Sequence, residues 1–173
     1  MISGLKVAVL VFVASILEVS VFSDVKILGG VPDLLLVTVV AVALLRGSVT
    51  GACAGFFAGL VVDTATLETL GLSSLLLTLI GYWVGRYGET TGRDRTHAPF
   101  LSVAVVTFLY ALGGLALRFV LGEPAPARVV LLDSLFQGIA LNLLLTVPVY
   151  AVVRRLLPPR FRVTRGEGAP ALG

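Results

Sequence analysis

The chain has 173 residues, of which 57% are hydrophobic and 13% are charged, and its formal net charge is +3. Its mean hydropathy is +1.03. A soluble domain averages about 25% charged residues, so this chain has too few charges for an ordinary cytosolic enzyme or a disordered segment. Its single cysteine, Cys53, and single histidine, His97, exclude an intrachain disulfide and a Cys/His metal site. The composition predicts a helical membrane protein with one domain.

Windows without charged residues mark the segments that could cross a membrane. A hydrocarbon core of about 30 Å requires about 20 apolar residues in a helix. The two windows nearest the C-terminus reach that length unaided, whereas the two nearest the N-terminus reach it only if their terminal acids lie among the headgroups. We predict an all-α, polytopic transmembrane bundle of about six helices in a single domain over 1–157, followed by a flexible basic cytoplasmic tail over 158–173. The expected spans are 5–23, 31–45, 47–62, 69–87, 98–119 and 129–155.

The second expected span is open to two other interpretations. By length alone, 31–45 could be a buried or re-entrant segment. Alternatively, one helix could cover 31–62, but it would be about 48 Å long. That helix would also place Arg46 near the bilayer centre, at a cost of about 2.5–3.5 kcal/mol or more. We therefore interpret Arg46-Gly47 as a tight turn between two helices.

The distribution of basic residues predicts the orientation. With the N-terminus inside, ten lysines and arginines fall on the cytoplasmic side and three on the outer side. Cytoplasmic loops carry an excess of Lys and Arg, so we expect both termini in the cytoplasm. The ten are Lys6, Arg46, Arg86, Arg93, Arg95, Arg154, Arg155, Arg160, Arg162 and Arg165; the three are Lys26, Arg118 and Arg128. Attraction to anionic lipid explains this charge, and no nucleic acid partner is expected.

The start of the chain has some features of a secretory signal, with Lys6 before an apolar run. No A-x-A cleavage site follows, and Glu18 interrupts the region where one would lie. We expect this segment to be retained as the first span.

The third span carries a ladder of glycines. Gly47, Gly51, Gly55 and Gly59 recur at intervals of four residues, and Asp63 continues the register. Four-residue spacing places them on one slowly drifting stripe of a helix, and such a stripe lets another helix backbone approach closely. Packing within the bundle, against the fourth span, is the favoured interpretation, and a partner interface is the alternative. Asp63 would lie at the outer face, where water could hydrate it.

Other polar residues near the span ends have structural explanations. Asp33 follows a proline at a helix start, where an acid is favourable, and Glu18 could reach the headgroups. An Asp133–Arg118 pair would neutralise two charges near the outer face. Asn142, deeper in the last span, is expected to hydrogen-bond to a neighbouring helix.

Sequence signatures of catalysis are missing from the chain. It contains no G-x-x-x-x-G-K-[ST], no G-x-G-x-x-G and no H-E-x-x-H, and Gly71-Leu72-Ser73-Ser74-Leu75 lacks the second glycine of a nucleophile elbow. His97 has no acid or base at a useful spacing. We therefore predict a protein that is not an enzyme and that requires no cofactor.

An ordered series of motifs over 31–88 resembles the rod shape-determining protein MreD family of the bacterial inner membrane. The order and spacing of the motifs carry the resemblance more than any one of them does. The motifs are Pro32-Asp33-Leu34, Leu44-Leu45-Arg46-Gly47, the ladder Gly51, Gly55 and Gly59-Leu60, then Asp63, Leu70-Gly71, Gly81-Tyr82 and Gly85. The arginine-rich tail is longer than the family pattern needs.

The resemblance implies a non-enzymatic component of the cell-elongation machinery that directs lateral peptidoglycan synthesis. It implies direct binding to the bitopic protein MreC, and a complex with the actin-like MreB, the polymerase RodA and a class B penicillin-binding transpeptidase. The family motif transfers no catalytic residue. The residues it transfers as candidates for a partner interface or for packing are Asp33, Arg46, Gly51, Gly55, Gly59 and Asp63.

A solute-binding subunit of an energy-coupling-factor vitamin transporter is the alternative, because the family is similar in plan to those subunits. This function would need a polar pocket near the outer face, where Glu18, Asp33, Asp63 and Asp133 could converge. The A-x-x-x-A pattern expected in the first span of such subunits is missing. An intramembrane hydrolase is a third and more distant hypothesis.

Overall fold

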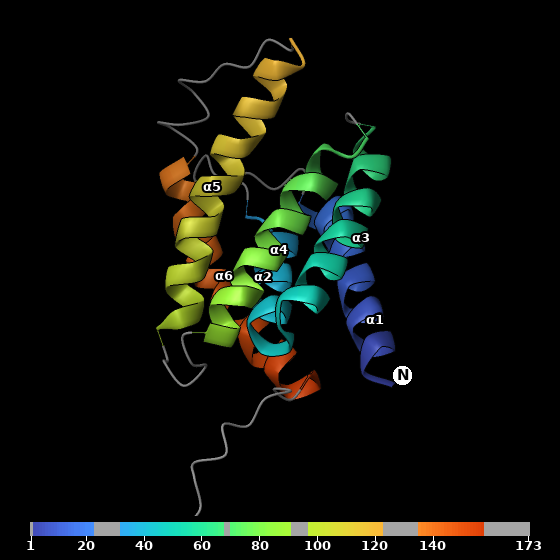
Figure 1. Ribbon diagram of the computed structural model, residues 1–173, viewed down its shortest axis with the longest axis vertical. Helices are drawn as coiled ribbons and strands as arrows, with labels where there is room; N and C mark the ends of the chain where they lie inside the picture. Colours follow the sequence, from blue (N-terminus) through green and yellow to red (C-terminus); the bar gives the residue numbers. More distant parts are fainter. Residues whose placement is uncertain (1, 23–31, 68–69, 91–96, 123–134, 158–173) are drawn as a thin grey trace, which may run out of the picture.

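The computed structural model describes residues 2–22, 32–67, 70–90, 97–122 and 135–157, and these residues form helices connected by short turns (Figure 1). The prediction of an all-α bundle with six helices is confirmed for this part of the chain. The start of the expected 129–155 span, the 158–173 tail and Asp133 lie outside it. The helices are α1 (Ile2–Leu17), continued by a short π-helical segment η1 (Glu18–Phe22), then α2 (Leu34–Arg46), α3 (Ser48–Thr66), α4 (Leu72–Thr90), α5 (Ala98–Val120) and α6 (Leu135–Leu156).

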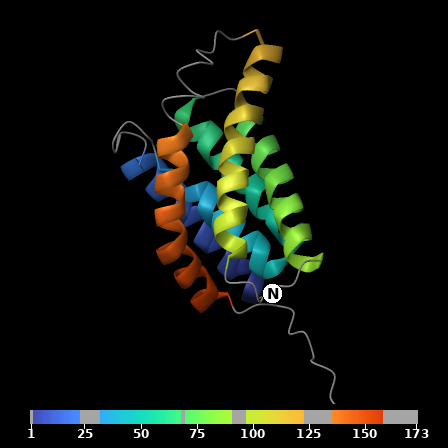
Figure 2. The same cartoon turned by 90° about the vertical axis from the view of Figure 1, so that its left-hand side faces the viewer.

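The helices run back and forth between two ends of the bundle. The start of α1 and the end of α6 lie at the same end (Figures 1 and 2), which we call the terminal end. The turn between α2 and α3 also lies there, whereas the turn between α3 and α4 lies at the opposite end (Figure 1). Lys6, Arg46, Arg86, Arg154 and Arg155 belong to the terminal end, and Arg118 lies near the end of α5 at the opposite end. Basic charge in the described residues is therefore concentrated at the terminal end.

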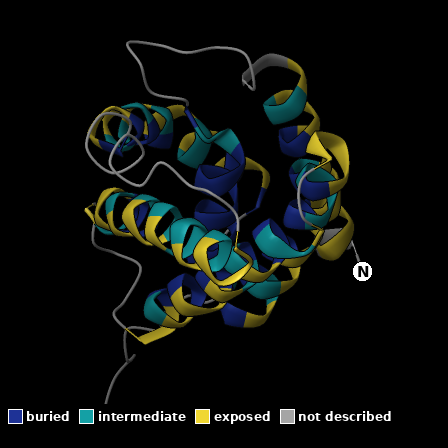
Figure 3. Ribbon diagram, turned by 90° about the horizontal axis from the view of Figure 1, so that it is seen from above, coloured by how far each residue is buried: buried dark blue, intermediate teal, exposed yellow. Residues whose placement is uncertain are grey.

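The centre of the bundle is α2. Every residue from Leu35 to Leu45 is buried, and α2 contacts each of the other five α-helices. Seen from above, buried residues face the middle of the molecule and exposed ones face outward (Figure 3). With 13 residues, α2 is about 20 Å long, shorter than a hydrocarbon core of about 30 Å. The second expected span therefore contains a short helix, α2, that is surrounded by protein.

The outer surface of the bundle is strongly apolar. Each peripheral helix exposes large hydrophobic side chains, for example Val9, Phe57, Leu75, Leu101 and Leu144. A soluble protein rarely exposes apolar patches of this extent, and lipid is the solvent that accommodates them. Within the described residues, three helices are both long enough and apolar enough to cross a bilayer, namely α3, α5 and α6.

A single glycine separates α2 from α3. Gly47 has a φ of 95°, in the region that side chains disfavour. Its N–H donates to the Ala43 carbonyl at 2.8 Å, and its own carbonyl accepts from Gly51 N–H at 2.9 Å. The predicted turn at Arg46-Gly47 is confirmed, and the alternative of one helix over 31–62 is wrong.

Candidate functional site

The glycine ladder lies in the contact between α3 and α4, which is the most extensive contact between two helices in the described part of the chain. A Cβ atom added to Gly51 would overlap the carbonyl oxygen of Gly81, and one added to Gly55 would overlap the carbonyl oxygen of Leu77. At Gly59 it would overlap the backbone of Ser74. The two backbones are therefore close enough that no side chain fits between them.

The fourth helix contributes its own glycines to the same contact. A Cβ atom on Gly81 would overlap the Gly51 carbonyl, and one on Gly85 would lie against the backbone of Gly47 and Ser48. The Ser74 hydroxyl donates to the Phe56 carbonyl at 2.9 Å across the contact. These contacts correspond to the packing interpretation of Gly51, Gly55 and Gly59, because α4 occupies the stripe that a partner would need.

Asp63, at the end of the ladder, holds the start of α4. It is 1% exposed. One carboxylate oxygen accepts from Gly71 N–H at 2.8 Å and Ser74 N–H at 3.4 Å, and the other accepts from Ser73 N–H at 3.3 Å. The first N–H groups of a helix have no intrahelical partner, and an anion is favourable there. Asp63 is therefore a buried cap of α4 rather than the hydrated surface acid that we expected.

Two other carboxylates meet at the start of α2. Asp33 accepts from Leu36 N–H at 2.7 Å, while Glu18 accepts from Leu34 N–H at 2.8 Å and Leu35 N–H at 3.3 Å. Together they satisfy the first three N–H groups of α2 through partly buried hydrogen bonds. The expectation that Glu18 extends to the headgroups is wrong, because η1 directs it toward α2.

Asn142 connects α2, α5 and α6 beside these carboxylates. It is 1% exposed. Its side-chain oxygen accepts from Asp33 N–H at 2.7 Å, and its side-chain nitrogen donates to the Thr107 hydroxyl at 3.1 Å. The predicted hydrogen bond from Asn142 to a neighbouring helix is confirmed. These two hydrogen bonds join the start of α2 to α5 and α6.

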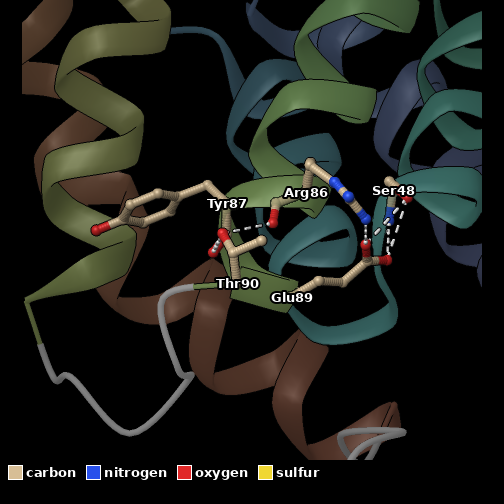
Figure 4. A network of polar contacts seen from close by, with 5 residues as sticks. All are labelled: Ser48, Arg86, Tyr87, Glu89 and Thr90. Carbon is tan, nitrogen blue, oxygen red and sulfur yellow. Dashed lines mark hydrogen bonds and ion pairs between the residues drawn. The ribbon is translucent and has the colours of Figure 1, made fainter.

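Glu89 joins α3 and α4 at the terminal end (Figure 4). Its carboxylate accepts from Ser48 N–H at 2.8 Å and from the Ser48 hydroxyl at 3.1 Å, and it lies 3.5 Å from the Arg86 guanidinium. The Ser48 N–H, with the Ser48 hydroxyl and Arg86, lowers the pKa of the Glu89 carboxyl below its ordinary value. Glu89 therefore caps the start of α3 in the same way that Asp63 caps α4.

Arg46 is another charged residue of the terminal end. It occupies the last turn of α2, where a positive charge is favourable beside the free carbonyl groups. Its Nε atom is buried and has no hydrogen-bond partner among the residues described.

The structure brings some of the candidate residues together and separates others. Asp33 lies beside Glu18 at the start of α2, Asp63 lies at the start of α4, and Arg46 lies at the far end of α2. Each of these three carboxylates accepts from backbone N–H groups at the start of a helix. Asp133, the fourth acid that the solute-binding alternative invoked, lies outside the described residues. Within the described ranges, no group of three or more His, Cys, Asp or Glu residues could hold a metal ion.

Sequence reasoning missed the roles of Glu18 and Glu89. Both cap a helix that is distant in the chain, by 16 residues from Glu18 to Leu34 and by 41 residues from Glu89 to Ser48. No local motif reports such a pairing. The available signal was indirect: the start of α3 follows Gly47 without a side-chain cap of its own, so an acceptor had to come from elsewhere.

A family model for the rod shape-determining protein MreD matches residues 1–157. This chain belongs to the MreD family. Comparison with curated proteins and with solved structures found no match. The match extends the resemblance seen in the 31–88 motifs over all six helices. Membership places the chain among the membrane proteins that determine rod shape and act in cell elongation.

Proposed function

We propose that this MreD-family protein is a non-enzymatic membrane scaffold that binds MreC and helps direct lateral peptidoglycan synthesis. The family match over 1–157 carries the proposal. The roles of the interior polar residues support it, because Asp33, Asp63 and Asn142 all serve helix ends or helix contacts. RodA, MreB and a class B penicillin-binding transpeptidase would belong to the same complex.

In this proposal the terminal end faces the cytoplasm, and the chain crosses the inner membrane several times. The concentration of basic residues at the terminal end supports this orientation, since Lys and Arg are retained on the cytoplasmic side. The Asp63 cap and the Asp33–Glu18 pair would then lie toward the periplasm. The tail over 158–173, with three arginines, would extend into the cytoplasm.

The outward face of α1 is the surface that we propose for the membrane-spanning helix of MreC. Because α4 covers the glycine ladder, a bitopic partner needs another surface with small residues. Gly4 and Ala8 are both exposed and four residues apart, and no atom lies within 4 Å of the position of a Cβ on Gly4. Small residues at this spacing let two helices approach closely in a membrane. Phe12 and Ile16 continue the face toward the opposite end.

Replacing Ala8 with Leu is expected to weaken the co-purification of MreC about tenfold, because a bulky side chain separates the two helix backbones. A loss of about 1.4 kcal/mol corresponds to this factor, and helix association in membranes relies on such close packing. The measurement is the amount of MreC that is retained by tagged protein from solubilised membranes.

Ala151→Leu is the matched control, because Ala151 is exposed on α6 and the side-chain change is the same. The control is expected to retain MreC at the wild-type level. Wild-type retention by Ala8→Leu would show that α1 is not the contact surface. Loss of MreC by both variants alike would also contradict the proposed surface. A wild-type protein that never retains MreC would instead overturn the proposed function.

A further inference from the structure

An apolar groove of about 430 Å³ runs between α4 and α5 on the side of the bundle. Figure 2 shows these two helices side by side. The groove walls are Leu, Ile, Val and aromatic side chains, with Ser102 as the one small polar residue among them. On α4 the walls extend from Leu76 to Tyr87, which is about 17 Å along the helix axis.

The groove begins near the terminal end and extends toward the middle of α4. Tyr87 is one turn from the end of α4, and Leu101 is in the first turn of α5. Figure 4 shows the Tyr87 ring directed toward α5, away from the Ser48–Glu89 contact. Half of a hydrocarbon core of about 30 Å is about 15 Å, so the groove matches the depth of one leaflet.

The chemistry of the walls favours an acyl chain over another helix. Close helix–helix contact in membranes uses small residues, but the glycines of α4 face other helices of the bundle. Gly81 and Gly85 face α3, and Gly88 faces α2. The groove side of α4 instead presents Leu79, Ile80 and Trp83. These bulky side chains leave a channel that a flexible chain can follow and that a second helix backbone cannot approach closely.

We propose that the groove binds one acyl chain of an anionic phospholipid from the leaflet at the terminal end. The hydrocarbon tail lies along Leu79, Ile80 and Val105, and the headgroup lies beyond Tyr87. Most of the basic residues described for the chain belong to this end. Arg86 is the neighbour of Tyr87 in the chain, although its side chain is directed to Glu89 on the α3 side. Basic residues near a membrane surface attract anionic headgroups, which accounts for the selectivity.

The only tryptophan of the chain, Trp83, lines the groove and reports its occupant. The full-length protein is reconstituted in phosphatidylcholine that contains a small fraction of phosphatidylglycerol with brominated acyl chains, which quench tryptophan on contact. One basic residue near the headgroup is expected to enrich anionic lipid at the groove roughly fivefold. We therefore expect the degree of quenching that randomly mixed lipid would give if the fraction of brominated lipid were roughly fivefold higher. Unlabelled phosphatidylglycerol is expected to relieve the quenching, and brominated phosphatidylcholine in a phosphatidylglycerol bilayer is expected to give no excess.

Val105→Phe fills the groove, and Val147→Phe makes the same change on α6 outside it. Val105 is 48% exposed and Val147 is 59% exposed, so the two sites tolerate a larger side chain similarly. The excess quenching is expected to disappear in the first variant and to persist in the second. Wild-type quenching that follows random mixing would overturn the proposal whatever the variants do. Quenching below random mixing would mean that protein covers the groove, and would overturn it as well.

Discussion

Replacing Gly55 with Leu is expected to separate α3 from α4 and to lower the stability of the bundle severely. The new side chain would collide with the Leu77 carbonyl oxygen, and a backbone atom cannot move aside as a side chain can. Overpacking costs about 1–3 kcal/mol where neighbours can adjust, so we expect a loss at or above the upper end of that range. The measurement is the midpoint of thermal unfolding of the purified protein in detergent.

Gly114→Leu is the matched control for this experiment. Gly114 is also inside a long helix, α5, but no atom lies within 4 Å of its Cβ position. Leucine has a higher helix propensity than glycine, so this variant is expected to unfold at or above the wild-type midpoint. Equal midpoints for Gly55→Leu and the wild type would contradict the packing role of the ladder.

The second large effect is expected from Asp63→Ala. This change leaves the N–H groups of Gly71, Ser73 and Ser74 without their acceptor. Losing a helix cap costs about 0.5–2 kcal/mol, and each buried unsatisfied donor adds about 1–3 kcal/mol. Because the turn before α4 is partly accessible to solvent, we expect a total of about 2–4 kcal/mol, again read from the unfolding midpoint.

Asp63→Asn tests the hydrogen-bond acceptor apart from the negative charge, because it keeps one side-chain oxygen and removes the charge. An amide oxygen in place of the first carboxylate oxygen can still accept from Gly71 N–H and Ser74 N–H, but the amide nitrogen cannot accept from Ser73 N–H. The midpoint of this variant is expected to lie between those of Asp63→Ala and the wild type. A wild-type midpoint for Asp63→Ala would show that the cap contributes nothing to stability.

The spacing of apolar residues, together with the residues that end helices and form turns, predicted most of the helices. Arg46-Gly47 marked the α2–α3 turn because a glycine at positive φ after a basic residue is a typical helix end. The spacing of Gly51, Gly55 and Gly59 indicated close packing with the following span. Both signals are local, so one chain is enough to see them.

The environment of α2 could not be predicted in the same way. A continuous apolar run looks the same whether lipid or protein surrounds it, and only the shortness of the 31–45 range hinted at burial. The structure distinguishes the two cases because Leu35 to Leu45 are buried on all sides. The Asp33–Asn142 bond, between residues 109 apart in the chain, is another feature that depends on the assembled bundle.

Labelling of single cysteines from outside the inner membrane tests the central claim most directly. In a Cys53→Ser background, Leu67→Cys places a thiol at the opposite end, where Leu67 is exposed, and Thr90→Cys places one at the terminal end. In spheroplasts, a membrane-impermeant maleimide is expected to label Leu67→Cys at once and Thr90→Cys only after lysis. Immediate labelling of Thr90→Cys, or protection of Leu67→Cys until lysis, would contradict a bundle that crosses the membrane with its terminal end in the cytoplasm.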